Sequence, residues 1–125
     1  MRDAASSVIA LRPFVPASDF EASKLFYADL GFRVFPLGEG LAEATLGEHT
    51  FLLQKFSAEG FAGNFMMHML VNDVATWWEK VSTLGLGKKY GVKEPGPPKD
   101  EPWGLTVLYL VDPSGVLWHI TQRTG

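Results

Sequence analysis

The chain has 125 residues, of which 46% are hydrophobic and 20% charged, a balance typical of one globular domain rather than a disordered or fibrous chain. It has no cysteine, which excludes disulfides and thiolate sites, and no apolar run approaches the roughly 18–20 residues of a membrane helix. The net charge of −3 disfavours a nucleic-acid surface, since phosphate contacts need clustered Lys and Arg. Residues 1–7 lack the apolar core of a secretory signal, so we expect a cytoplasmic protein that binds neither nucleic acid nor membrane.

The first half of the chain predicts a strand, a helix and three more strands. Residues 8–15 are apolar and partly β-branched and are followed by Pro16, which indicates a strand at a sheet edge. Ser18 or Asp19 can cap a helix over residues 20–30, which Gly31 ends. Further strands are expected over 32–37, 41–46 and 50–56 because turns containing glycine separate these apolar runs.

The second half repeats this order. A strand is expected over residues 65–71, and Asn72 or Asp73 can cap a helix over 74–84 that Gly85 ends. Strands over 105–111 and 116–121 follow, joined by a turn over residues 112–115. Residues 88–102 contain four prolines and predict a long loop, which in a compact domain is often functional.

A fixed spacing relates the two halves. Gly31 lies twelve residues after Asp19, and Gly85 lies twelve residues after Asp73, so the offset between the two helix starts is 54 residues. We therefore predict an α+β fold of two tandem βαβββ modules, over about residues 8–57 and 64–122, within the single domain 1–125. The alternative is an α+β sandwich in which the similarity of the halves is accidental.

Three short stretches resemble the vicinal oxygen chelate superfamily, which contains glyoxalase I, extradiol dioxygenases, fosfomycin-resistance enzymes and bleomycin-resistance proteins. Residues 26–32 (Phe-Tyr-Ala-Asp-Leu-Gly-Phe) resemble its first-helix signature, and residues 112–115 followed by 116–120 resemble its final hairpin. Pro102-Trp103-Gly104 is similar to the bleomycin-resistance branch. The resemblance covers nearly the whole chain and implies a curled mixed sheet around a central cleft, with the helices outside. In this branch it also implies a homodimer whose interface builds the cleft.

The metal positions of the enzymes in this superfamily are poorly filled here. By the resemblance they correspond to Arg12 and Met66 on the first strands of the modules, and to His119 and a residue near Leu53 on the last strands. Arginine stays protonated, and methionine is a poor ligand for hard or borderline divalent ions. A catalytic zinc site normally needs three protein ligands, so we expect neither a metal nor another cofactor.

His68 keeps a metal-binding alternative open. It lies two residues after Met66 and therefore shares its strand face, so His68 and His119 would both line the cleft. Two imidazoles with waters can hold a weakly bound divalent metal, or they can contact a ligand directly.

Aromatic residues complete the predicted ligand site. Trp103 lies between the proline-rich loop and a strand, where an indole can stack on a planar or cationic ligand. Tyr109 shares strand parity with Trp103 if the strand extends that far, and Phe14 shares a face with Arg12. Five acidic side chains near turns and the long loop are mostly solvated but could attract a cation: Glu39, Glu43, Glu94, Asp100 and Glu101.

The predicted function is non-catalytic binding of a small molecule, a bleomycin-type antibiotic, with resistance through sequestration. The predicted ligand-binding residues are Trp103, His68, His119, Arg12, Tyr109 and Phe14. One alternative is a divergent metal-dependent enzyme, similar to glyoxalases or dioxygenases, that uses His68 and His119. Another is a binder of an unidentified metabolite.

Overall fold

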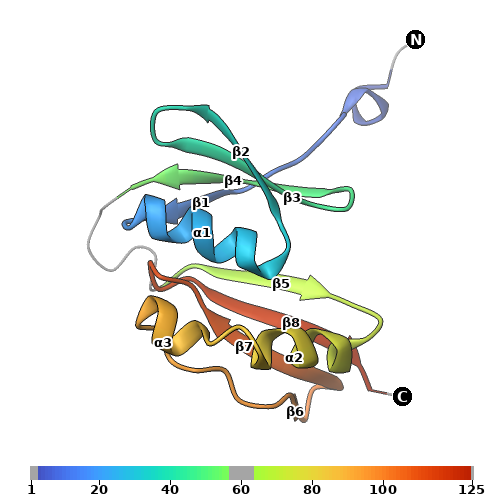
Figure 1. Ribbon diagram of the computed structural model, residues 1–125. Coiled ribbons are helices and arrows are strands. Elements are labelled where there is room, and N and C mark those ends of the chain that lie inside the picture. The colour runs from blue at the N-terminus through green and yellow to red at the C-terminus, as the bar shows by residue number, and fades with distance from the viewer. Residues whose placement is uncertain (1–2, 57–63, 125) are drawn as a thin grey trace.

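The computed structural model describes residues 3–56 and 64–124 and confirms two βαβββ modules (Figure 1). The first module contains β1 (Phe14–Ala17), α1 (Phe20–Leu30), β2 (Arg33–Gly38), β3 (Leu41–Leu46) and β4 (His49–Lys55). The second contains β5 (Met66–Leu70), α2 (Val74–Ser82), α3 (Leu86–Tyr90), β6 (Lys99–Asp100), β7 (Leu105–Val111) and β8 (Leu117–Arg123). A short 3-10 turn, η1 (Ala5–Ser7), precedes them.

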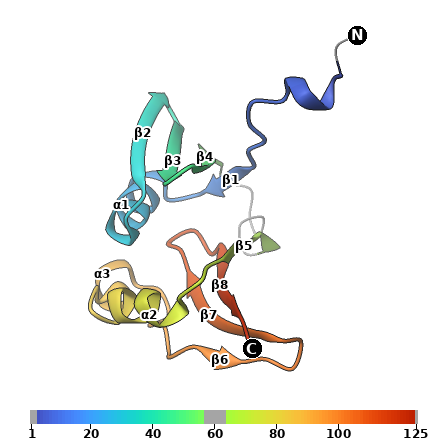
Figure 2. The same cartoon turned by 90° about the vertical axis from the view of Figure 1, so that its right-hand side faces the viewer.

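Each module has its own four-stranded mixed sheet. The strand orders are β1-β4-β3-β2 and β5-β8-β7-β6, so the two sheets have the same topology. In each sheet the first and last strands of the module pair in parallel, and the other neighbours are antiparallel. The three α-helices lie on one side of the two sheets (Figure 2), and the opposite face of each sheet, here called the outward face, has no α-helix of the described residues over it.

The local signals at the helix starts are confirmed. The Asp19 carboxylate accepts a hydrogen bond from Ala22 N at 3.1 Å, and the Asp73 carboxylate accepts one from Thr76 N at 3.2 Å. Each satisfies a backbone donor that the first turn of a helix leaves unpaired. Gly31 ends α1 with φ of 108°, a left-handed conformation that strongly favours glycine.

Several predicted boundaries differ from the structure, including the last strand, which ends at Arg123 rather than at Thr121. The first strand begins at Phe14 rather than at residue 8, and the chain before Arg12 runs away from the sheets (Figures 1 and 2). The second helix ends at Ser82, two residues early. The long loop also contains the helix α3 and the short strand β6, which pairs with β7.

One buried core joins the modules. Trp118 of β8 packs between three aromatic side chains of the first module, with ring centroids 5.6–5.8 Å away (Tyr27, Phe32 and Phe51). The Tyr27 hydroxyl donates to Asp112 Oδ2 at 2.5 Å and accepts from Trp118 Nε1 at 2.9 Å. The modules therefore share hydrogen bonds as well as apolar contacts.

No helix in the described parts of the chain is long and apolar enough to cross a membrane.

Candidate functional site on the outward sheet faces

Three of the predicted site residues form one row across the second sheet. His68 of β5 pairs with His119 of β8, which pairs with Tyr109 of β7. Directly paired residues point to the same face of a sheet, and neighbouring residues such as Trp118 point to the core. The structure thus confirms that His68 and His119 are neighbours, and it adds Tyr109 to them.

The environment of this row favours neutral groups. Burial, and next the proximity of His68, lower the pKa of His119, while Glu101 opposes the shift. Burial and Glu101 raise the pKa of Tyr109. The Tyr109 and His119 rings contact edge to face, with centroids 4.9 Å apart. At neutral pH the row therefore presents an imidazole and a phenol that can donate or accept hydrogen bonds beside a flat aromatic surface.

Arg12 and Phe14 belong to the outward side of the first sheet. Phe14 pairs with Leu52 of β4, and Leu52 pairs with Glu43 of β3. Arg12 Nη1 lies 3.6 Å from Glu43 Oε2, so its guanidinium is already occupied by a carboxylate. Phe14 is 53% exposed, and Phe35, at the far end of the same row, is 64% exposed. The sequence-based prediction missed Phe35.

Trp103 lies in a turn before β7 and is 58% exposed. The shared parity of Trp103 and Tyr109 required the strand to reach Trp103, and because β7 begins at Leu105 this condition is not met. The following Gly104 has φ of 88°, which reverses the chain where the strand starts. The indole is therefore available to a ligand from a position outside the strand.

The structure corrects the first-module counterpart of His119 by one residue. His119 pairs with His68 as Leu52 pairs with Phe14, so the equivalent of His119 is Leu52. Leu53, the residue expected near this position, is fully buried on the core side. A register change of one residue moves a side chain to the opposite face of a sheet.

Within residues 3–56 and 64–124, no group of three or more His, Asp or Glu side chains is placed to hold a metal ion. His68 and His119 supply two imidazoles in register, and among the described residues no third ligand joins them.

Several acidic side chains that could attract a cation already have partners. Glu43 pairs with Arg12, Glu94 Oε1 accepts from Gly87 N at 3.0 Å, and Asp100 Oδ1 accepts from Thr106 Oγ1 at 2.6 Å. Glu101 is the acidic group that acts on both Tyr109 and His119.

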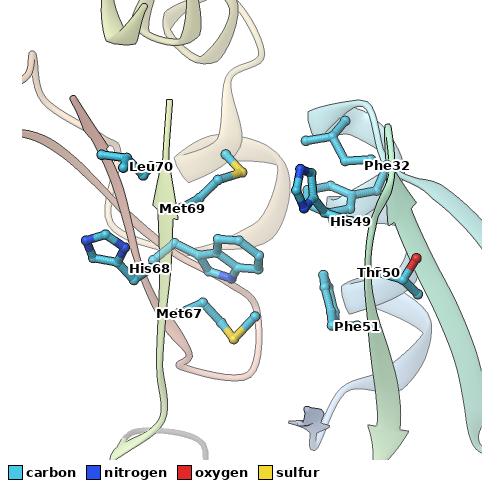
Figure 3. A pocket seen from close by; sticks show the side chains of 10 residues that line it. Phe32, His49, Thr50, Phe51, Met67, His68, Met69 and Leu70 are labelled. Carbon is cyan, nitrogen blue, oxygen red and sulfur yellow. The ribbon is translucent and has the colours of Figure 1, made fainter. Parts of the chain in front are cut away.

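Two cavities flank the His68-His119-Tyr109 row. One, of about 370 Å³, lies between the modules on the core side and is lined mostly by apolar residues (Figure 3). Met67 and Met69 face His49 and Phe51 across it, and the His68 ring points to the other side of β5. The other, of about 360 Å³, adjoins Tyr109 beneath residues 93–97. A cleft between the modules was expected from the repeat and the resemblance, and residues 88–102 were expected to form a functional loop, but the residues that line each cavity come from segments distant in the chain.

Comparison with known proteins shows which family has this arrangement of two βαβββ modules. Residues 9–120 match the model of the Glyoxalase/Bleomycin resistance protein/Dioxygenase superfamily. The chain therefore belongs to the Glyoxalase/Bleomycin resistance protein/Dioxygenase superfamily.

The relatives include both binding proteins and an enzyme. The chain is 27% identical over 115 residues to a bleomycin resistance protein of Klebsiella pneumoniae, covering 89% of this chain and 90% of that one. A bleomycin-binding protein in complex with bleomycin superimposes with a TM-score of 0.79 and 24% identity, over 93% of this chain and 99% of that chain. A lactoylglutathione lyase from Agrobacterium tumefaciens has a TM-score of 0.65 and 20% identity, over 92% of this chain and 94% of that chain. At these identities the two solved structures establish the shared fold.

Proposed function

We propose that the protein binds a bulky, planar, partly cationic small molecule of the bleomycin type on its outward sheet faces and sequesters it without chemical change. The observation that carries the proposal is the set of aromatic side chains exposed to solvent on or beside these faces, Phe14, Phe35 and Trp103. Burying such rings is favourable, so faces that expose them are suited to a ligand or a partner. The bleomycin resistance protein to which the chain is similar supports the choice of ligand.

Each group has a distinct role in this proposal. The Trp103 indole stacks on the planar part of the ligand and attracts its positive charge through the ring face. His68, His119 and Tyr109 donate or accept hydrogen bonds along one side of the ligand. Phe14 provides apolar contact, and Arg12 holds the Glu43 carboxylate near it.

The binding unit in this proposal is a homodimer. Ile9 and Leu11 are 99% and 94% exposed on an extended segment that points away from its own sheets (Figure 2). A second copy would cover this segment and bring an outward face of one chain against an outward face of the other. The ligand would then lie between aromatic residues of both chains.

A metal-dependent enzyme is the second candidate. His68 and His119 favour it, because two imidazoles in register on one face can bind a divalent metal, and the related lactoylglutathione lyase shows that the fold can accommodate an enzyme. Stoichiometric Zn, Mn, Ni or Fe in the purified protein, lost when both histidines are replaced, would favour this candidate over simple binding.

Calorimetric titration with bleomycin tests the proposed function. We expect saturable binding that Trp103→Ala weakens by about tenfold or more, because large aromatic side chains usually dominate binding energies. Leu25→Ala is the matched control, since Leu25 is an exposed apolar residue on α1 away from the outward faces, and its affinity should stay within about twofold. Absence of binding at high micromolar drug would remove bleomycin as the ligand.

A further inference from the structure

The proline-rich segment after α3 has no counterpart in the first module and forms a pocket on the outward face of the second sheet. The pocket encloses about 360 Å³ and is lined by Lys93, Glu94, Pro95, Gly96, Pro97, Lys99, Tyr109, Val111 and Leu117. Val111 pairs with Leu117 in the row next to the one formed by Tyr109 and His119. The pocket therefore adjoins the proposed ligand site.

Contacts at both ends hold this segment in place. At its start, the Glu94 carboxylate accepts from Gly87 N, and a Cβ on Gly87 would lie 3.1 Å from Glu94 Cβ and Val92 O. At its end, Lys99 and Asp100 pair with β7. Prolines at 95, 97 and 98 restrict the backbone between these anchors. The pocket wall is thus preformed, which lowers the entropic cost of binding.

The charged residues that line this pocket are Lys93, Glu94 and Lys99. Among the described residues, neither Lys93 nor Lys99 forms an ion pair. Glu94, the carboxylate in the lining, is bonded to the Gly87 amide. The Tyr109 hydroxyl donates to the carboxylate of Glu101, and burial and this carboxylate raise the pKa of Tyr109. Two lysines therefore line the space beside Tyr109, and the prolines, Val111 and Leu117 give it apolar walls.

We infer that this pocket binds the anionic end of a small organic ligand, a carboxylate or a phosphate carried on an apolar or planar body. Lys93 and Lys99 supply the charge, and the Tyr109 ring, Val111 and Leu117 contact the body. The inference rests on the proposed function in taking the outward face as the ligand site. It adds that the ligand carries a negative group at one end, so a purely cationic drug would leave this pocket unused.

Titration of the full chain with phenyl phosphate and benzoate, followed by two-dimensional ¹H–¹⁵N NMR, tests this inference. We expect saturable shifts at the amides of Lys93, Gly96, Lys99 and Tyr109, with an affinity roughly fivefold or more above that for benzyl alcohol or benzylamine. The anion that binds more tightly identifies the preferred head group. Inorganic phosphate alone should bind more weakly than phenyl phosphate, because it cannot use the apolar wall.

Three lysine variants provide the comparison. Lys93→Met and Lys99→Met should each weaken phenyl phosphate binding by roughly two- to fivefold, the effect of one solvent-exposed charge. Lys88→Met makes the same charge change on α3 outside the pocket and should leave the affinity unchanged. Equal binding of phenyl phosphate and benzyl alcohol, or equal losses in all three variants, would overturn the inference. Inorganic phosphate binding as tightly as phenyl phosphate would overturn the claim of an apolar body.

Failure of the anion pocket and failure of the proposed drug binding give different outcomes in these two titrations. If bleomycin binds and the aromatic anions do not, the outward face is a drug site and the anion pocket is wrong. If the anions bind at these residues and bleomycin does not, the pocket stands and the drug named in the proposed function is wrong.

Discussion

The buried hydroxyl of Tyr27 connects the two modules. It comes from α1 of the first module, donates to Asp112 in the turn between β7 and β8, and accepts from the indole of Trp118. Asp112 also accepts from the backbone N–H groups of Ser114 and Val116. Burial raises the pKa of Asp112, so its carboxylate depends on these donors when it is charged.

Removing this hydroxyl should reduce stability at neutral pH. In Tyr27→Phe, a buried carboxylate oxygen loses a donor and the Trp118 N–H loses its acceptor, so the free energy of unfolding should fall by about 1–3 kcal/mol. Tyr109→Phe removes a phenol that is only half-buried and should change stability by no more than about 0.5 kcal/mol. Urea unfolding at pH 7 measures both variants.

The same tyrosine predicts the direction of alkaline instability. Burial raises the pKa of Tyr27 well above the ordinary value of 10.0, and burial also raises the pKa of Tyr90 and Tyr109. Above about pH 10 the unfolded chain loses protons that the folded chain keeps, so the free energy of unfolding falls as pH rises. In Tyr27→Phe this fall should be shallower by up to about 1.4 kcal/mol per pH unit. An unchanged slope, or wild-type stability at pH 7, would contradict the role assigned to this hydroxyl.

Sequence patterns predicted the regular elements best where the determinants are local. Asp19, Gly31 and Asp73 act on the backbone within a few residues, so the starts of both main helices and the end of α1 were predicted correctly. Strands β3 and β7 were also predicted with their observed bounds, because turns define them on both sides.

The elements that the sequence did not reveal depend on tertiary contacts. Helix α3 has five residues between Gly85 and Gly91 and no side-chain N-cap, so its sequence alone is too weak a signal. In the folded chain, Lys89 Nζ donates to Asp29 Oδ2 at 2.7 Å, and the Tyr90 hydroxyl donates to the same carboxylate. These contacts with α1 supply the stability that a single short turn lacks.

In the candidate site, too, some features could be predicted from the sequence and others depend on tertiary contacts. The resemblance to the superfamily placed Met66 and His119 in the cleft, and strand alternation placed His68 on the same face as Met66. The Arg12-Glu43 pair, the exposed Phe35 and the lysine pocket depend on pairing between distant strands and on the path of a loop. Sequence periodicity contains no information on those contacts.

At the scale of the whole molecule, the exposed residues before β1 favour association with a second copy. Ile9 and Leu11 contribute nothing to the described core and are almost fully accessible. We expect sedimentation equilibrium to show a concentration-dependent dimer, which replacing both residues with serine shifts toward monomer because the buried apolar area is lost. Leu25→Ser, on α1, is the control and should leave the association constant unchanged. A wild-type chain that stays monomeric at high micromolar concentration would contradict this prediction.

The central claim is that the outward sheet faces, rather than the cavity between the modules, hold the ligand. Mapping the amide shifts of the full chain by two-dimensional ¹H–¹⁵N NMR during titration with bleomycin tests it most directly. The account predicts the largest changes at Trp103, His68, His119 and Tyr109, on or beside the outward face of the second sheet. Changes confined to residues around the cavity between the modules, such as His49, Phe51 and Met69, would contradict it.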